Sequence, residues 1–309
     1  MKLHVIFDFM HIYYKYFFMK KGGKIKTLKA PIYWNGSMIE KDTTLIYYPL
    51  KDIEEIRREF ELQGHEVTMS ICFDMPSHRK DAGVVDGDGY KSGRKKSLTD
   101  EDHKNIQLIQ NLLDEAGYNT YRYNGYEADD IVNYLIRKHA NDFDGNIIYT
   151  NDKDLLINIK DNVAAMRYKA GQGYAYVTKE NYETYLEKEF EVFIPYNSLG
   201  LYLSTAGDSS DTIKGITKFG KVAFKKLITK ISAKNNIDWS ICGDYDELLK
   251  IVPMCEEFLK PEQYQELINS FHLVANLELV DEIPAPTKQG NKELRTKAYE
   301  KYQMISLIP

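Results

Sequence analysis

The chain has 309 residues, of which 43% are hydrophobic and 28% charged, and its formal net charge is -5. At about 100–200 residues per domain this length predicts two domains, and the composition excludes a disordered or fibrous protein. The longest apolar runs, 3–7 and 45–50, are far shorter than the ~20 residues that a membrane helix needs, and Asp8 interrupts any signal-peptide core. We therefore expect a cytoplasmic protein without a membrane segment.

The cysteines and the charges exclude further classes of protein. The three cysteines, Cys72, Cys242 and Cys255, form no C-x-x-C pair, which excludes a disulfide framework and a conventional zinc site. The net negative charge excludes a surface coated uniformly for polyanions, so nucleic-acid binding would need separate basic patches. Lysines do cluster at 20–29, 91–96 and 214–230, although each run by itself is typical of a solvated surface.

The first two hundred residues alternate between predicted strands and helices. The apolar run 3–7 predicts a buried strand, and the segments 66–73 and 144–150 are two further strand candidates. Asp8 and Asp74 directly follow the first two segments, and Asn151-Asp152 follows the third. Helical patterns lie between these strands, at 49–63, 99–116 and 127–139. This order predicts an α/β domain with a mainly parallel central sheet and flanking helices, whose ligand crevice lies beyond the carboxyl ends of the strands.

After about residue 200 the pattern changes. Helical segments are predicted at 221–230, 245–251 and 261–271, with no strands between them, and the segment 284–292 is expected to be extended. We therefore divide the chain into a sheet-based domain at 1–200 and a helical region at 201–309.

Acidic residues form the densest signal in the sequence. Three acids stand within four positions at the start of the helix predicted from Glu127, and pairs occur at 152/154 and at 208/211. Helix caps or turns could account for any one of these sets. Together with the acids that end the first two strands, however, nine carboxylates could converge on one crevice: Asp8, Asp74, Glu127, Asp129, Asp130, Asp152, Asp154, Asp208 and Asp211. Oxygen-only ligands of this kind favour Mg²⁺ or Mn²⁺ over Zn²⁺.

Four segments in a fixed order carry a family resemblance. Residues 127–130, 150–154, 176–181 and 207–211 resemble the signature of the 5′-nuclease superfamily, which includes phage and bacterial flap endonucleases and 5′-3′ exonucleases. The resemblance covers roughly residues 3–230. It implies a PIN-like nuclease domain with a helical arch around 79–100, followed by a DNA-binding region with a helix-two-turn-helix around 212–230. The implied activity is cleavage of flapped, nicked or gapped duplexes during removal of replication primers or flaps, in the cytoplasm of a bacterial or phage-infected cell.

The resemblance also assigns the acids to two metal ions. The first metal and the bridging positions fall to Asp8, Asp74, Glu127, Asp129 and Asp130. The second metal falls to Asp152, Asp154, Asp208 and Asp211. Two Mg²⁺ ions, for which Mn²⁺ can substitute, would activate a water and stabilise the departing oxygen.

Basic residues at 90–94 resemble the Tyr-Lys-x-x-Arg element of the family. The resemblance makes Lys91 and Arg94 catalytic cations at the base of the arch and places Tyr90 and Arg79 on the DNA. Arg79 lies 11 residues before Tyr90, farther than the family's usual spacing, so that 81–89 reads as an insertion. A solvated basic loop is the alternative interpretation.

Two further segments are expected to bind DNA. Tyr14 and Lys15 stand where the family often has an aromatic residue and an Arg, so Tyr14 could stack on an unpaired base or could belong to the core. The segment 213–221 and the helix after it resemble the helix-two-turn-helix. Lys218 replaces a usual Gly there and Val222 a frequent Lys, so K⁺ binding at this element is only a secondary expectation. The DNA contacts assigned to this element are Lys214, Gly215, Lys218, Gly220, Lys221 and Lys225.

Three other functions would account for part of the acidic pattern. A compact acid-cluster ribonuclease would lack the helix-two-turn-helix and the element around Lys91. A haloacid-type phosphatase would have a second Asp shortly after the first strand, where this chain has Asp8-Phe9-Met10. A junction-binding protein with a dead site would be more stable without nine crowded acids. The expected partners are DNA with a 5′ flap, a nick or an RNA primer and, further, replication proteins, and the chain is expected to be a monomer.

Overall fold

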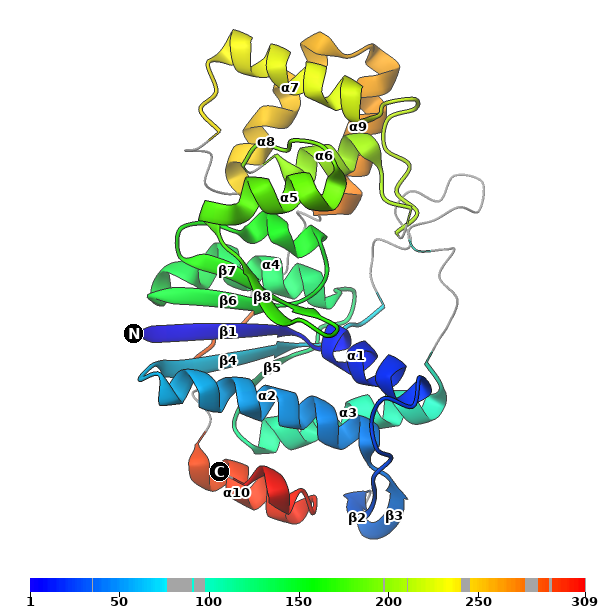
Figure 1. Ribbon diagram of the computed structural model, residues 1–309, viewed down its shortest axis with the longest axis vertical. Helices are drawn as coiled ribbons and strands as arrows, with labels where there is room; N and C mark the ends of the chain where they lie inside the picture. The colour runs from blue at the N-terminus through cyan, green and yellow to red at the C-terminus, as the bar shows by residue number, and fades with distance from the viewer. Residues whose placement is uncertain are drawn as a thin grey trace.

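A mainly parallel sheet forms the centre of the computed structural model (Figure 1). The structure describes residues 1–34, 36–76, 91, 98–196, 198–209, 211–239, 245–275, 283–288 and 291–308. Within these residues the sheet has six strands in the order β5-β4-β1-β6-β7-β8, and only the β7–β8 pair is antiparallel. Its strands are β1 (Lys2–Asp8), β4 (Glu66–Cys72), β5 (Asn119–Tyr121), β6 (Gly145–Tyr149), β7 (Val163–Lys169) and β8 (Gly173–Val177).

The α/β class and the three predicted strands are confirmed. The predicted strands are β1, β4 and β6, which are adjacent in the sheet. Strands β5, β7 and β8 were not predicted from the sequence, and neither was a separate antiparallel hairpin of β2 (Lys29–Trp34) and β3 (Ser37–Asp42). None of them is followed directly by an acid-rich segment of the kind that drew attention to β1, β4 and β6.

Helices surround the sheet and fill the second half of the chain. They are α1 (Phe9–Lys21), α2 (Thr44–Leu62), α3 (Asp100–Glu115), α4 (Ala128–His139), α5 (Tyr182–Phe190), α6 (Leu199–Ala206), α7 (Lys221–Asn235), α8 (Tyr245–Met254), α9 (Pro261–Ala275) and α10 (Lys292–Lys301). Short 3₁₀ turns are η2 (Ala140–Asp142), η3 (Asp154–Asn158), η4 (Lys179–Asn181), η5 (Glu256–Phe258) and η6 (Ile305–Leu307). Helix α2 begins before the predicted start at Pro49, because the Asp42 carboxylate accepts a hydrogen bond from the Thr44 N–H at 3.0 Å.

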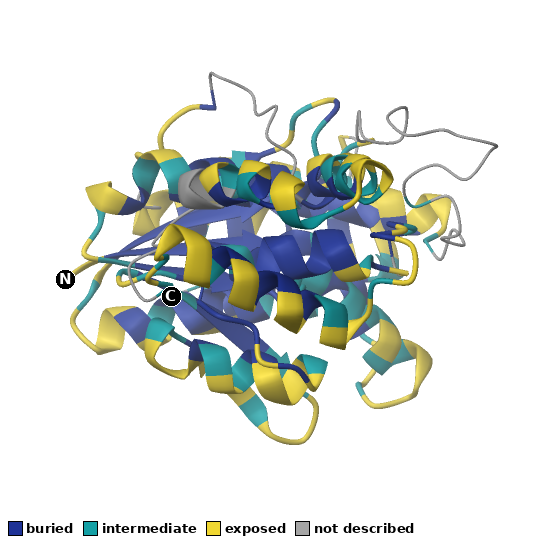
Figure 2. Ribbon diagram, turned by 90° about the horizontal axis from the view of Figure 1, so that it is seen from above, coloured by how far each residue is buried: buried dark blue, intermediate teal, exposed yellow. Residues whose placement is uncertain are grey.

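The alternation of side chains along β1 explains the layers. Leu3, Val5 and Phe7 point to one face and pack with apolar residues of α1, α2 and α3. Ile6 points to the other face and packs with α4 through Ile131. Because both faces of the sheet are covered, its central strands β4, β1 and β6 are buried between helices, as Figure 2 shows, whereas the edge strand β8 is partly exposed.

Helices α5 to α9 form a second core above the sheet in Figure 1. This core also includes Leu156 and Val177, which precede residue 200. Helix α10, in contrast, returns to the first core, where Tyr299 is buried. Hydrophobic packing among the described residues therefore does not follow the chain order, and a division into domains at residue 200 stays a prediction.

A buried carboxylate holds α10 in place. Glu54 on α2 accepts hydrogen bonds from the hydroxyls of Tyr118 and Tyr299 through one oxygen. Its other oxygen pairs with the Arg57 guanidinium at 2.7 Å. A buried charge of this kind is tolerated because its hydrogen-bonding capacity is satisfied. Among the described residues, no helix has the length and apolar character to cross a membrane.

Candidate functional site

The acids predicted to end three strands lie at one edge of the sheet. Because β4, β1 and β6 are neighbours and parallel, their carboxyl ends point the same way. Asp8 ends β1, and its carboxylate accepts hydrogen bonds from the His11 N–H at 3.3 Å and the Thr150 hydroxyl at 3.1 Å. Asp74 follows β4 and accepts from the Ala128 N–H at 2.8 Å, at the first residue of α4. These contacts join the strand ends to the acidic start of α4.

Negative charge is crowded in a first group of acids, which consists of Asp8, Asp74, Asp129 and Asp152. Burial, together with repulsion from Asp74 and Asp152, raises the pKa of Asp8 from 3.8 to about 7. Burial and the charge of Asp152 also hold the pKa of Asp129 well above its usual range. The prediction that acids from separate segments converge is therefore confirmed for these four residues.

A second group of acids adjoins the first at Asp152. Burial and the charges of Asp152, Asp208 and Asp211 hold the pKa of Asp154 well above its usual range. The Asp154 N–H donates to the Asp152 carboxylate at 2.9 Å, and the Asp154 Oδ1 atom is buried and has no hydrogen-bond partner in the part of the chain that the structure describes. Asp152 thus interacts with both groups.

A tight loop after α6 delivers Asp208 and Asp211. Gly207 has a φ of +78°, and a Cβ there would lie 2.6 Å from the Ile213 carbonyl oxygen. Gly215 has a φ of +66°, and a Cβ there would lie 2.4 Å from the Gly207 nitrogen. Only glycine fits both positions without displacing backbone, so the two glycines fix the path of the loop beside the sheet.

Two lysines neutralise part of the negative charge. The Lys91 Nζ lies 2.8 Å from a Glu127 oxygen and 3.7 Å from an Asp211 oxygen, so Lys91 faces the acids as predicted. The Lys91 N–H also donates to the Asp211 carbonyl at 3.0 Å. The second lysine, Lys153, lies 2.8 Å from Asp208 and was missed by the sequence analysis. Its position between Asp152 and Asp154 is the signal that could have identified it.

The donors suit a hard divalent cation, although they are not already arranged as a cage. Among the described residues, no three Asp, Glu, His or Cys side chains lie in a ready metal-binding arrangement. The donors are carboxylates whose charge the two lysines offset only in part, and one buried oxygen of Asp154 has no hydrogen-bond partner among the described residues. Oxygen-only donors of this kind fit a hard divalent cation such as Mg²⁺ or Mn²⁺. Asp130 differs, because its carboxylate accepts the Glu127 N–H at 2.8 Å and caps α4.

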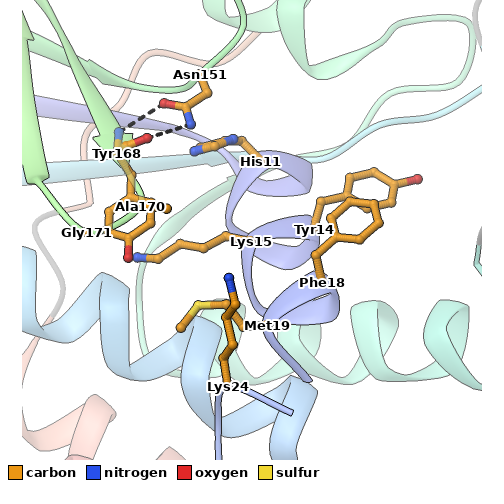
Figure 3. Close-up of a pocket in the computed structure, with 10 residues that line it drawn as sticks. All are labelled: His11, Tyr14, Lys15, Phe18, Met19, Lys24, Asn151, Tyr168, Ala170 and Gly171. Carbon is orange, nitrogen blue, oxygen red and sulfur yellow. Dashed lines mark hydrogen bonds between the residues drawn. The ribbon is translucent and has the colours of Figure 1, made fainter. Parts of the chain in front are cut away.

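The two aromatic and basic residues predicted on α1 have different surroundings. Tyr14 lines a cleft of about 540 Å³ and stacks on Phe18 with ring centroids 5.9 Å apart (Figure 3). Lys15 lines the same cleft, but its Nζ pairs with Asp52 at 2.8 Å and lies 4.1 Å from the centre of the Tyr168 ring. The environment of Tyr14 is therefore compatible with stacking, whereas the charge of Lys15 is already paired inside the protein.

The lysines before and within α7 are exposed. Lys214, Lys218 and Lys225 face solvent, and Lys221 pairs with Glu191 on the surface at 3.0 Å. Lys218 has a φ of +59°, the left-handed conformation that favours glycine, although a lysine occupies this position. Gly220 is the N-cap of α7, which confirms the predicted helix start at Lys221. Arg79, Tyr90, Arg94 and most of the predicted arch at 79–100 lie outside the described residues.

Comparisons with known proteins agree with this architecture. The sequence profile of the family described as "5′-3′ exonuclease, N-terminal resolvase-like domain" matches residues 3–191. The 5′-3′ exonuclease of Buchnera aphidicola is 28% identical over 198 residues, which are 64% of each chain. The matched part thus spans less than two thirds of that relative's length.

Solved structures of bacteriophage T5 proteins share the fold over nearly the whole chain. The T5 flap endonuclease, in a complex with DNA and metal ions, superposes with a TM-score of 0.58 at 14% identity and covers 97% of this chain and 99% of its own. The T5 5′-exonuclease with bound zinc ions gives a TM-score of 0.56 at 14% identity and covers 99% and 100%. At this identity the likeness concerns the fold.

Proposed function

We propose that this chain, which belongs to the family of the 5′-3′ exonuclease N-terminal resolvase-like domain, is a structure-specific 5′ nuclease. It hydrolyses DNA phosphodiesters near junctions of single and double strands, as a flap endonuclease and 5′-3′ exonuclease. The observation that carries the proposal is the meeting of two groups of carboxylates at Asp152, with Lys91 facing both. Primer or flap removal in replication is the expected context.

The carboxylates would hold the divalent ions. In our assignment Asp8, Asp74, Glu127, Asp129 and Asp130 serve the first ion and the bridging positions, and Asp152, Asp154, Asp208 and Asp211 serve the second. Mg²⁺ is the proposed ion, with Mn²⁺ as a substitute. When bound, such ions activate a water and stabilise the leaving oxygen of a phosphodiester. The raised pKa of Asp8 supports this role, because a bound cation would relieve the repulsion that raises it.

The protein's own cations would orient the substrate. Lys91 would donate to a nonbridging oxygen of the scissile phosphate, and its contacts with Glu127 and Asp211 support this role. Arg94 would assist it, and Tyr14 would stack on an unpaired base beside the cleaved bond. The exposed lysines from Lys214 to Lys225 would bind the phosphates of the duplex, with K⁺ at the same element as a secondary expectation.

The direct test is cleavage of end-labelled duplexes. The purified protein is incubated with 5′-flap, nicked, blunt and RNA-primed substrates in Mg²⁺ or in chelator, and product lengths are mapped. We expect cleavage only with the metal, at positions set by the 5′ end or the junction. Products scattered without regard to the 5′ end would contradict structure specificity, and cleavage in chelator would contradict the metal assignment.

A matched variant separates crevice acids from surface acids. Asp161 is an exposed carboxylate paired with Lys179 at 2.7 Å, outside both groups of acids. Asp161→Asn should cleave like the wild type, whereas Asp129→Asn should be inactive. Equal activity of these two variants would remove the support that the acidic crevice gives to the proposal.

A further inference from the structure

We infer that Lys153 is a positioning residue whose ammonium group holds Asp208 in the metal-free protein and competes with a divalent cation for that carboxylate. The inference deepens the proposed function, on which the role of the second group of acids rests. The Lys153 ammonium would weaken metal binding by the second group of acids, Asp152, Asp154, Asp208 and Asp211, until the metal displaces it from Asp208.

The contact itself is close and asymmetric. The Lys153 Nζ lies 2.8 Å from Asp208 Oδ2, and the Asp208 side chain is 3% exposed while that of Lys153 is 31% exposed. The carboxylate is therefore fixed inside the protein, and the ammonium approaches it from the solvent side. If the ion pair separates, movement of the Lys153 ammonium into water costs less free energy than movement of the buried Asp208 carboxylate.

The backbone aims Lys153 at the second group. The residue precedes η3, and the hydrogen bond from the Asp154 N–H to the Asp152 carboxylate at 2.9 Å closes the turn that contains it. Asp208 belongs to the separate loop after α6, so the ion pair joins the end of the sheet to that loop.

The consequence concerns metal occupancy. A divalent ion that binds Asp208 would lie within a few ångströms of the Lys153 ammonium, and the two positive charges would repel each other. Lys91 imposes a similar condition at Glu127, but the proposed function requires Lys91 for catalysis. Lys153 can therefore be changed to examine metal binding with less direct effect on the substrate phosphate.

Mn²⁺ binding without DNA tests the inference. Calorimetric titrations would compare wild type with Lys153→Met, Lys153→Gln and Lys153→Arg, and with the surface control Lys179→Met. Lys179 is 30% exposed and also pairs with an aspartate, so it matches Lys153 in exposure and in type of partner. We expect the weaker Mn²⁺ step to tighten about fivefold in the Met and Gln variants, and to stay unchanged in the Arg variant and the control.

A double-mutant cycle identifies the partner. If Lys153 acts through Asp208, Lys153→Met should change Mn²⁺ affinity much less in an Asp208→Asn background than in the wild type. Thermal unfolding in chelator checks that each variant is folded, and the Gln variant serves where the Met variant is not. Unchanged or weaker Mn²⁺ binding in the folded Met or Gln variant would overturn the inference. Because no substrate is present, this result is independent of whether the wild type cleaves DNA.

Discussion

The end of the sheet and the surface of α7 carry charge in opposite ways. At the sheet end Asp8, Glu127 and Asp208 are buried, and burial together with neighbouring acids raises the pKa of Asp8 to about 7. On and before α7 the lysines are exposed, and Lys221 makes only a surface ion pair. Crowded buried charge is costly and is kept only where geometry demands it, whereas exposed charge costs little and acts at a distance. The comparison therefore separates a region expected to perform chemistry from one expected to bind.

Removal of a crevice carboxylate should have the largest effect. We expect Asp129→Asn and Asp152→Asn each to lower the single-turnover cleavage rate by about 10³-fold or more, because metal binding supplies several kcal/mol of transition-state stabilisation. Junction affinity should stay near that of the wild type, since the exposed lysines are unchanged. The two quantities are measured by quenched-flow cleavage and by fluorescence anisotropy. A flap cut at near the normal rate by either variant would refute the metal assignment.

Removal of Lys91 should have the next largest effect. Its ammonium lies 2.8 Å from Glu127, among the acids and not with the exposed lysines. We expect Lys91→Ala to lower kcat by about 10²–10³-fold, the usual loss when one preorganised donor is removed. Kd for the junction should change little. A normal single-turnover rate combined with weaker junction binding would show that Lys91 binds DNA, like the exposed lysines of α7, and does not act in catalysis.

The cost of crowding can be measured as a pH dependence. The pKa of Asp8 is raised from 3.8 to about 7, so the folded metal-free protein binds a proton that the unfolded chain releases. Its free energy of unfolding should therefore fall as the pH rises from about 4 to 7. In chelator at pH 8, Asp8→Asn should be more stable than the wild type by about 4 kcal/mol, because a rise of about 3 pKa units corresponds to about 1.4 kcal/mol per unit. Urea unfolding across this range measures the difference, and parallel profiles for the two proteins would contradict it.

The smallest effect is expected on the α7 surface. Replacing Lys221 and Lys225 together by Ala should reduce the steepness of log affinity against log salt concentration by about one to two. Each phosphate contact releases counterions from the DNA, so a protein with fewer contacts depends less on salt. The cleavage rate at saturating DNA should change little. The measurement is duplex binding at several salt concentrations, with Lys179→Ala as a surface control. A slope equal to that of the wild type would place the duplex contact elsewhere.

The sequence predicted the elements whose signal is local. Local residue patterns identified β1, β4 and β6, and the acids that follow them located the crevice, because parallel strands end at a common edge. Glycine and lysine patterns also located the start of α7. The short or charged strands β5, β7 and β8 were missed because their stability comes from neighbours in the sheet and not from their own composition.

Which charges meet was decided only by the tertiary structure. The sequence by itself determined the α/β class, the acidic segments and their order along the chain. It did not determine that the Lys15 ammonium is paired with Asp52, that Lys153 contacts Asp208, or that Tyr299 of the last helix binds Glu54. Each of these pairs joins residues far apart in the chain, with separations of 37, 55 and 245 positions. Such contacts depend on how strands and helices pack, because an ion pair forms only where packing brings both partners within a few ångströms.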